Sequence, residues 1–436
     1  MYVSESRGST PAATTPTARG LFPGRSAVPT TVLVLGTVSL VTDISSEMVT
    51  AVLPLYLVAG LGLSPLGFGL LDGVYNGFSA LVRLVGGHLA DRGGRHKTVA
   101  ALGYGLSAIS KPLLLAAHTL PLIGAVLAMD RTGKGLRTAP RDALISLSSP
   151  PETRGRAFGV HRAMDTTGAL LGPLVAFLIL RQAPEGYNVV FTVSFCVAAL
   201  AVIVLLLFVP SRAPELGATP ASAAERPSLR AAVALLGRRE LRRLMLCAVV
   251  LSLATVSDSF IYLLLQRQLG VPDRWIALLP LGTAVAFLLL AVPLGRWADR
   301  VGRWRVFIGG HLALLAAYGL LLTHVQSGWL PYAVLALHGA FYAATDGVLM
   351  AAAAGSVPAV LRSSGLALVQ TGQAAARFVG SIAFGAAWTA WGDRSALIGA
   401  ALALALSLVL SIRLRPAAEH SAAEGSAEEK GVTGSD

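Results

Sequence analysis

Long apolar segments recur along the chain and are separated by short polar stretches. A helix needs about 20 predominantly apolar residues to cross the hydrocarbon core of a bilayer. The first half of the chain contains six such segments, at 28–60, 66–90, 98–118, 120–148, 157–180 and 187–209. The second half contains six more, at 242–269, 274–298, 306–326, 329–357, 364–390 and 395–413. The pattern predicts an all-α polytopic membrane protein with twelve transmembrane helices.

Polar stretches divide these helices into two sets. Residues 210–240 are rich in Pro, Ala, Ser and Arg and contain few apolar residues, which is typical of a linker. We therefore expect a six-helix bundle at 28–209, a cytoplasmic linker at 210–240 and a second six-helix bundle at 241–414. The ends, 1–27 and 415–436, have too little apolar content to bury a core, and we expect both to be disordered tails.

The composition excludes an ordinary soluble protein. Of 436 residues, 54% are apolar and only 13% are charged, which is about half the charged share of an average globular domain. The mean hydropathy is +0.67. The two cysteines, Cys196 and Cys247, both lie in apolar segments, so the sequence offers neither a disulfide framework nor a paired-cysteine metal site.

The net charge of +12 is explained by where the basic residues lie. If the N-terminus is cytoplasmic, the loops on that side collect most of them: Arg92, Arg95, Lys97, Arg154, Arg156, Arg212, Arg226, Arg230, Arg238, Arg239, Arg300, Arg303, Arg305 and Arg362. The loops on the other side keep only Arg181, Arg267, Arg274 and Arg394. This asymmetry predicts a multi-pass protein of the cytoplasmic (inner) membrane with both termini in the cytoplasm. It also explains the basic excess without nucleic acid as a partner.

A short loop sequence occurs once in each half. Gly-His-Leu-Ala-Asp-Arg-Gly-Gly-Arg at positions 87–95 is repeated as Gly-Arg-Trp-Ala-Asp-Arg-Val-Gly-Arg at positions 295–303, which is 208 residues later. A weaker repeat pairs the eight residues from Ser39 with the eight residues from Ser252 and places an acid on the first helix of each half. Internal repeats of this kind are common in secondary transporters. We interpret each half as one copy of a six-helix unit.

Two acidic residues on the first helix are the leading candidates for a functional site. Asp43 and Glu47 are four residues apart, so they project from one face of the helix, one turn apart and near its midpoint. Two carboxylates in a cavity of low dielectric constant repel each other and lose hydration, which favours binding of a proton to one of them. We expect this pair to carry a proton reversibly and a cationic substrate to displace that proton.

Further charged and aromatic residues lie within the predicted helices. Asp72, Asp258 and Asp346 are expected to face the same cavity from other helices. Four basic residues are available as partners for the acids: Arg83, Lys111, Arg162 and Arg377. A structural ion pair is the alternative role for any one acid, because buried charges are usually paired. Several aromatic residues fit either a substrate cavity or belts at the membrane surfaces: Tyr56, Tyr75, Phe260, Tyr262, Tyr342, Trp388 and Trp391.

The fourth predicted helix carries an unusual number of charges. Arg131 lies near the membrane centre, where an unpaired arginine costs at least a few kcal/mol, so we expect it to face the cavity. Lys134, Arg137 and Arg141 follow within the same helix. Arg137 and Arg141, with Asp142, also fit a second interpretation, as anchors in the cytoplasmic headgroup region.

The fifth predicted helix combines a charged start with a row of small residues. His161 and Asp165 lie one turn apart near its cytoplasmic end, where gating and anchoring are alternative roles. Farther along, spaced small residues and a proline follow a pattern of close helix contact: Gly159, Gly168, Gly172 and Pro173. Glycines in a membrane helix let two backbones approach closely. This helix is therefore expected to pack tightly against a neighbour.

Together these motifs resemble those of the major facilitator superfamily of secondary transporters, in its drug and proton antiporter branch, over nearly the whole chain. Positions 87–97 match the family's loop pattern G-x-L-A-D-R-x-G-R-x-K. The resemblance implies that this loop and its repeat form a cytoplasmic latch for the outward-facing state, through Gly87, Asp91, Arg92, Gly94, Arg95, Asp299, Arg300 and Arg303. It also implies that Arg131 takes part in proton coupling and that the glycine pattern of the fifth helix is an antiporter signature. The chain departs from the family with Lys134 in place of a glutamine.

The resemblance and the acids together predict a secondary active transporter that couples proton entry to the efflux of small, drug-like organic molecules by alternating access. The expected partners are the substrate, protons and the lipid bilayer. We expect a monomer driven by the proton gradient, with no cofactor and no bound metal. No phosphate-binding loop, G-x-S-x-G or H-E-x-x-H pattern occurs, so the sequence does not predict an enzyme.

Three alternatives remain open from the sequence. The run from Asp130 to Ala143 resembles that of some bacterial nickel or iron transporters, although the helices contain no cluster of His or Cys as soft ligands. Uptake of an organic anion is the second alternative, with a set of basic residues that fit a carboxylate or phosphate: Arg83, Lys111, Arg131 and Lys134. The third is a membrane sensor that does not transport, although no sizeable soluble domain is visible.

Overall fold

The computed structural model describes residues 28–91, 96–149, 154–183, 186–210, 237–269, 273–323, 327–355 and 362–414. The expected tails and most of the expected linker lie outside this part. The first half contains α1 (Thr30–Leu55), the π-helical turn η1 (Tyr56–Gly60), α2 (Pro65–Asp91), α3 (His96–Ala116), α4 (Leu120–Leu147), α5 (Arg154–Gln182) and α6 (Tyr187–Phe208). The second half contains α8 (Arg239–Ala254), α9 (Asp258–Leu269), α10 (Asp273–Ile276), α11 (Leu279–Val301), α12 (Arg303–Leu322), α13 (Leu330–Gly355) and α14 (Arg362–Arg413).

The helices account for twelve membrane crossings. Within the described ranges, nine helical segments are long and apolar enough to span a membrane. The last of them lies within α14, whose 52 residues would form a straight helix about 78 Å long, more than twice the thickness of a hydrocarbon core. At Gly392 the backbone leaves the helical region, with φ 82° and ψ 166°, and α14 turns back to form two crossings. α2 and α4, with 27 and 28 residues, have spanning length but are more polar.

The prediction of one continuous helix at 242–269 is wrong. α8 ends at Ala254 and α9 begins at Asp258, and the three residues between them are not helical. Thr, Val and Ser are weak helix formers, so this stretch has little intrinsic preference to continue α8. The backbone N–H of Val256 donates instead to the hydroxyl of Tyr318 on α12, at 2.7 Å. The seventh crossing is therefore a broken helix, and the side chain of Tyr318 stabilises the break.

The two halves repeat the same close helix contact. Gly172 of α5 lies so near α1 that a Cβ atom there would be 2.8 Å from the carbonyl oxygen of Ile44. Gly380 of α14 lies against α8 in the same way, and its Cβ would be 2.6 Å from the carbonyl oxygen of Leu253. Positions 172 and 380 are 208 residues apart, which is the spacing of the loop repeat. The internal repeat is therefore seen in the helix packing as well as in the sequence.

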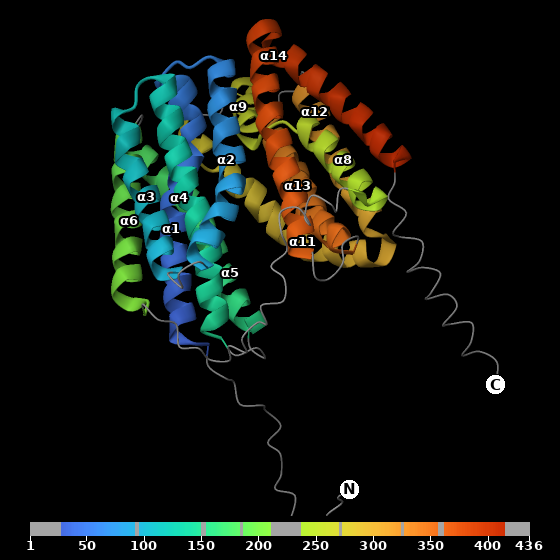
Figure 1. Cartoon of the computed structure of the whole chain (residues 1–436). Helices are drawn as coiled ribbons and strands as arrows, with labels where there is room; N and C mark the ends of the chain where they lie inside the picture. The colour runs from blue at the N-terminus through green and yellow to red at the C-terminus, as the bar shows by residue number, and fades with distance from the viewer. Residues whose placement is uncertain are drawn as a thin grey trace, which may run out of the picture.

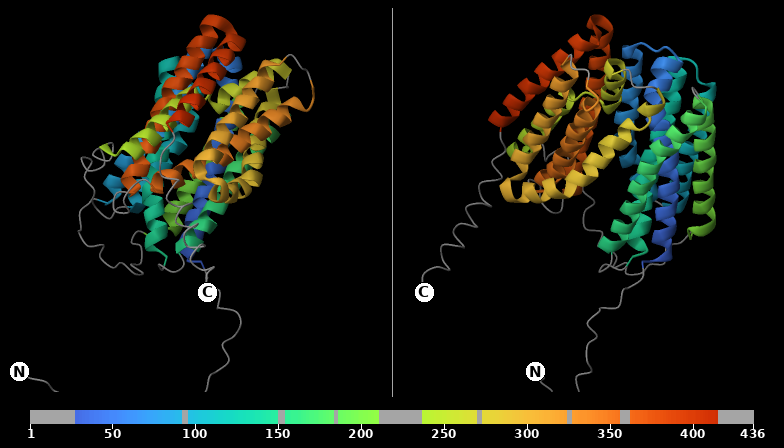
Figure 2. Two further views of the ribbon diagram at one scale, coloured as in Figure 1. Left: turned by 90° about the vertical axis from the view of Figure 1, so that its right-hand side faces the viewer. Right: turned by 180° about the vertical axis from the view of Figure 1, so that it is seen from behind.

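The first half (blue to green) and the second half (yellow to red) lie side by side (Figure 1). They approach each other at one end of the molecule and diverge toward the other (Figure 2). We call the first the Gly392 end, because it holds that turn, and the second the Thr30 end, where α1 begins. At the Gly392 end the backbone N–H of Leu66 on α2 donates to Oγ1 of Thr389 on α14, at 3.0 Å. Gly69 of α2 also lies very near α14, because a Cβ atom at this position would be 2.6 Å from the carbonyl oxygen of Ser381.

An aromatic cluster fills this contact between the halves. The ring centroids of Phe68 on α2 and Phe260 on α9 are 4.9 Å apart. Phe260 also packs at 4.9 Å against Phe384 on α14, which in turn packs at 5.9 Å against Trp388. All four side chains are buried. Such aromatic pairs contribute about 0.5–1.5 kcal/mol each beyond the burial of their surfaces. Phe260 and Trp388 therefore serve neither of their two predicted roles, and instead join the halves.

Candidate functional site

A cavity of about 380 Å³ lies between the two halves. α1 and α2 form its wall on one side, and α9, α11, α13, α14 and the break between α8 and α9 form the other. Small-molecule sites typically begin at about 300 Å³, so the space fits a small organic molecule. Because its wall is shared, a molecule bound here would contact both halves at once.

Three of the predicted acids line this cavity, namely Glu47, Asp258 and Asp346. Among the described residues, the carboxylates of Glu47 and Asp346 have no hydrogen-bond or ion-pair partner. Asp258 begins α9 and accepts a hydrogen bond from the hydroxyl of Tyr342 at 2.6 Å. Its Oδ1 also lies 3.3 Å from Nε2 of the buried His338. Glu47 and Asp346 are therefore the carboxylates left for a ligand.

One cation and three tyrosines are among the other polar residues of the lining. Arg377 of α14 reaches the cavity, and its buried Nε has no partner in the described part of the chain. Tyr75, Tyr262 and Tyr342 line the cavity rather than a membrane surface. The hydroxyl of Tyr262 donates to Oγ1 of Thr283 at 3.1 Å. With three carboxylates and one guanidinium among its described residues, the lining has an excess of negative charge.

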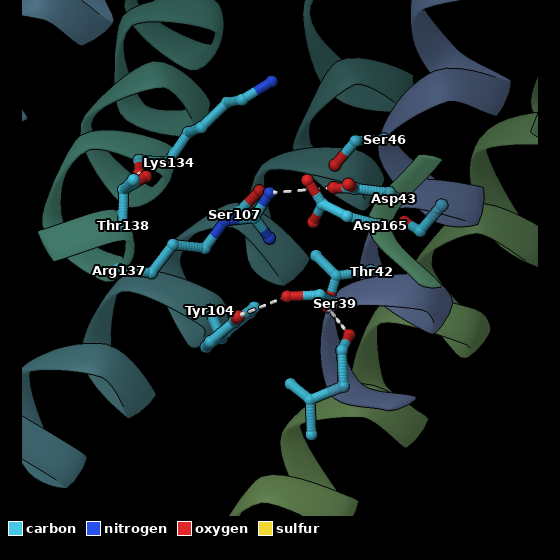
Figure 3. A network of polar contacts seen from close by, with 12 residues as sticks. Ser39, Thr42, Asp43, Ser46, Tyr104, Ser107, Lys134, Arg137, Thr138 and Asp165 are labelled. Atoms are coloured by element: carbon cyan, nitrogen blue, oxygen red, sulfur yellow. Dashed lines mark hydrogen bonds and ion pairs between the residues drawn. The ribbon is translucent and has the colours of Figure 1, made fainter. Parts of the chain in front are cut away.

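Asp43 does not share the cavity with Glu47, contrary to the prediction. Four residues advance a helix by about 400°, so the two side chains already diverge by about 40°. Asp43 turns toward α4, where Nη2 of Arg137 lies 3.4 Å from its Oδ1. Figure 3 shows Arg137 pointing at Asp43, with the carboxyl group of Asp165 on α5 beside it. The predicted proton pair on one helix is therefore divided between two places.

Asp72 also lies outside the cavity, although the sequence placed it there. It is buried, and its Oδ2 accepts a hydrogen bond from Oγ of Ser381 on α14, at 2.7 Å. The close approach of α2 and α14 at Gly69 brings Ser381 within reach. Asp72 therefore lies in the contact between the halves.

Arg131 is buried behind the cavity wall rather than in the cavity. It forms an ion pair with its neighbour Asp130, and its guanidinium carbon lies 3.8 Å from the ring centre of Tyr75. The other oxygen of Asp130 lies 2.6 Å from Nζ of Lys111 on α3. Asp130 therefore neutralises two buried cations. Lys111 pairs with Asp130 rather than with any of the acids predicted for the cavity. Asp130 was not among the predicted site residues.

The charges of α4 form one line along the helix. Asp130, Lys134, Arg137 and Arg141 are separated by four, three and four residues, a spacing that keeps side chains on one face and that points to this network in the sequence. Arg137 and Arg141 are only 3% and 8% exposed, so their interpretation as headgroup anchors is wrong. Nη1 of Arg141 lies 3.1 Å from Oγ of Ser39 and 3.5 Å from Oδ1 of Asp165. This face of α4 therefore binds α1 and α5 through ion pairs and hydrogen bonds of its arginines.

The glycine pattern of α5 is only partly used in close packing. Gly168 and Gly172 both press against α1, and a Cβ on Gly168 would overlap the carbonyl oxygen of Leu40. Pro173 is buried beside them. Gly159 has nothing within 4 Å of where its Cβ would stand. The expected tight contact is therefore made by the second and third glycines.

The predicted latch falls largely outside the described residues. Arg92, Gly94 and Arg95 lie outside them, and for Gly87, Asp91 and Asp299 only the helical backbone is described. Arg300 and Arg303 are exposed where α11 passes into α12. Gly302 links these helices with a φ of 108°, a conformation that favours glycine. The latch itself stays a prediction.

Across the described ranges, no group of three or more His, Cys, Asp or Glu side chains has an arrangement that would hold a metal ion.

A family model and several sequence relatives match this chain. The sequence model of the Major Facilitator Superfamily matches residues 35–288 and 244–434. An uncharacterized MFS-type transporter of Methanocaldococcus jannaschii is 28% identical over 387 residues, which cover 87% of this chain and 94% of that protein. The multidrug resistance protein MdtG of Salmonella paratyphi A is 28% identical over 322 residues, which cover 71% of this chain and 76% of that protein.

Solved transporter structures share the arrangement of the helices. The nucleoside transporter NupG aligns with 88% of this chain and 98% of its own, with a TM-score of 0.73 and 14% sequence identity. A bacterial homologue of the human lysosomal transporter Spinster, in an inward-facing and unoccupied conformation, aligns with 88% of this chain and 96% of its own, with a TM-score of 0.70 and 15% identity. At such identities the likeness shows the fold alone. This chain is an all-helical, multi-pass membrane protein that belongs to the Major Facilitator Superfamily of transporters.

Proposed function

We propose that this transporter exports small organic cations from the cytoplasm in exchange for protons. One observation carries the proposal: the carboxylates of Glu47 and Asp346, one from each half, line the cavity and make no hydrogen bond or ion pair with a described residue. A carboxylate in a partly dehydrated cavity attracts a cation more strongly than it would in water. A cation between these two acids would therefore bind both halves.

The aromatic lining favours an organic cation. The cavity includes the rings of Tyr75, Tyr262 and Tyr342, together with Phe287. Cations held against aromatic faces gain about 0.5–2 kcal/mol, most when water is excluded. Such a wall also accepts the apolar parts of a drug-like molecule. The similarity to a protein named for multidrug resistance agrees with this substrate class.

Alternating access supplies the transport step. The aromatic cluster around Phe260 closes the contact between the halves at the Gly392 end. The distribution of basic residues supports a cytoplasmic location for the Thr30 end. The conformer described above is then the one that receives substrate from the cytoplasm. Rocking of the halves about the cavity would open the Gly392 end and release the substrate outside.

Competition for the carboxylates supplies the coupling. A proton bound to Glu47 or Asp346 removes the negative charge that a cation needs, so each acid binds one or the other. A carrier that changes its facing only when its acids are neutralised will exchange protons for cations. Protons entering from outside then drive the return of the empty carrier.

Everted membrane vesicles test the proposal. The host strain lacks its own drug exporters, respiration acidifies the vesicle interior, and a pH-sensitive dye reports the gradient. Ethidium should release protons from vesicles that contain the wild type, whereas nickel, cobalt and zinc should not. Glu47→Gln and Asp346→Asn should each abolish this release. Glu240→Gln, at an exposed position outside the cavity, is the matched control. Release by metals alone would contradict the proposal and favour metal transport.

Uptake of an organic anion is a second candidate, favoured by Arg377 alone. Its guanidinium reaches the cavity, and its Nε has no partner in the described part of the chain. Lys111 and Arg131, which the sequence offered for this role, are instead neutralised by Asp130. Right-side-out vesicles offered labelled benzoate test it. Uptake that is lost in Arg377→Gln and retained in Glu47→Gln would favour the anion.

A further inference from the structure

A second charged site lies outside the substrate cavity, within the first half. Asp43 of α1 and Asp165 of α5 are at its centre, and Arg137 of α4 points at Asp43 (Figure 3). Arg141 lies 3.5 Å from Asp165, and Lys134 lies on the same face of α4. The backbone contact between Gly168 and Leu40 holds α5 against α1 one turn away. The two acids are therefore brought together by helix packing.

The carboxyl groups of Asp43 and Asp165 lie beside each other (Figure 3). An ionised carboxylate can only accept hydrogen bonds, so two neighbouring carboxyl groups can hydrogen-bond to each other only when one of them carries a proton. The side chains are 16% and 20% exposed, respectively, which gives that proton access to water.

Two arginines of α4 lie against the acids of this site. Arg137 forms an ion pair with Asp43, with 3.4 Å between Nη2 and Oδ1. Arg141 forms ion pairs with two acids, because its guanidinium lies 3.1 Å from Asp142 and 3.5 Å from Asp165. Three carboxylates thus face two guanidinium groups. Other charged or titratable groups near the pair are Lys134 from α4 and His161 and Arg162 from α5.

Two hydrogen-bond donors beside the pair are unused. Nη1 of Arg137 is buried and has no partner among the described residues, although the side chain is 97% buried and directed at Asp43. The ammonium group of Lys134 makes no hydrogen bond or ion pair with a described residue. It interacts electrostatically with both Asp43 and Glu47. Lys134 lies one turn from Arg137 on α4, and Glu47 lies one turn from Asp43 on α1, so the charge of Lys134 can act on both the acid pair and the cavity.

We propose that Asp43 and Asp165 together hold a second exchangeable proton, in addition to the one that competes with the cation at Glu47 or Asp346, and that Lys134 links this pair to the cavity. The inference rests on the proposed exchange of protons for cations. While the pair holds its proton, Lys134 stays near Glu47 and opposes cation binding. When the O–H bond breaks and the proton passes to water, both carboxylates are ionised and attract Lys134. Glu47 is then free to bind the cation, so proton release and cation binding become one exchange.

Infrared difference spectroscopy reads the shared proton without any substrate. The purified protein in lipid nanodiscs is titrated from acidic to alkaline pH. We expect a carboxylic-acid C=O band that disappears as the pH rises. In Asp43→Asn and Asp165→Asn this band should vanish or move to more acidic pH, because a lone carboxylate beside Arg137 or Arg141 has no second acid with which to share a proton. Asp165→Glu, which keeps a second acid, and Glu47→Gln should both retain it. An unchanged band in Asp165→Asn would overturn the proposal.

The role of Lys134 is tested by the pH dependence of cation binding. Equilibrium dialysis with labelled tetraphenylphosphonium gives the affinity of the purified protein at acidic and alkaline pH. The wild type should bind more tightly at alkaline pH. In Lys134→Gln the two affinities should become equal because binding improves at acidic pH, and Lys134→Arg should restore the difference. The same ratio in Lys134→Gln and wild type would overturn the link. A wild type that binds no cation would contradict the proposed function, while the infrared titration would still decide whether the proton is shared.

Discussion

Ser381 of α14 donates a hydrogen bond to Asp72 of α2 across the contact between the two halves, with 2.7 Å between Oγ and Oδ2. Asp72 is only 5% exposed, so this bond compensates a carboxyl group that has left water. The same contact contains the aromatic cluster and the approach of Gly69 to α14. A bond in this position exists only while the Gly392 end is closed. It should therefore influence which end of the transporter is open.

Ser381→Ala is expected to shift the carrier toward the conformer that is open at the Gly392 end. A buried polar group that loses its partner costs about 1–3 kcal/mol, and more if it is charged, which changes the ratio of the two conformers about 5-fold to 150-fold. Spin labels at Leu66→Cys and Trp391→Cys, with Cys196 and Cys247 replaced by alanine, report the distance between α2 and α14. The long-distance population should grow in the variant. Ser407→Ala, whose hydroxyl bonds only to Ala403 of its own helix, should leave it unchanged.

Gly172→Ala is expected to destabilise the first half. A Cβ atom at this position would be 2.7 Å from Cβ of Glu47 and 2.8 Å from the carbonyl oxygen of Ile44, so α5 must move away from α1. Overpacking of this kind costs about 1–3 kcal/mol. Thermal unfolding in detergent, followed by size-exclusion chromatography, should show a lower midpoint. Gly159→Ala adds the same methyl group where nothing lies within 4 Å, and an equal loss in that variant would refute the explanation.

Asp130→Asn is expected to be among the most damaging single changes in the first half. It would leave Lys111 and Arg131 as two buried cations without their counter-charge. Removal of one partner from a buried ion pair costs about 3–5 kcal/mol. The yield of folded protein and its unfolding midpoint should both fall. Adding Lys111→Met to Asp130→Asn should recover part of the loss, and a double variant less stable than Asp130→Asn would contradict this interpretation.

Tyr318→Phe is expected to destabilise the break between α8 and α9. Its hydroxyl is the acceptor for the backbone N–H of Val256, which is buried. Without it this N–H group has no partner, at a cost of about 1–3 kcal/mol. The unfolding midpoint should fall more than in Tyr332→Phe, where the tyrosine is 75% exposed. Equal midpoints in the two variants would show that another group holds the break open.

The sequence predicted the membrane-spanning helices well because the requirement for about 20 apolar residues is local. Even the turn at Gly392 falls between two predicted segments. The exception was the seventh crossing, where composition alone favours a continuous helix. Its break depends on the hydroxyl of Tyr318, which is 62 residues from Val256 and becomes a neighbour only in the folded protein.

The sequence offered the acids of the candidate site but not their grouping in space. Glu47, Asp258 and Asp346 line one cavity, whereas Asp43, Asp72 and Arg131 each lie elsewhere. Which acid faces which neighbour depends on the rotation of each helix, and the apolar pattern of a nearly all-apolar helix does not define that rotation. The regular spacing of charges along α4 is a sequence signal from which the second network could have been predicted.

The central claim is the exchange of protons for an organic cation through Glu47. Proteoliposomes of the purified protein, with an acidic interior and a clamped membrane potential, test it without other transporters. The account predicts that the wild type accumulates ethidium, that nigericin abolishes this accumulation by removing the pH gradient, and that Glu47→Gln does not accumulate it. Ethidium accumulation by the wild type that is the same with and without the pH gradient would contradict the account.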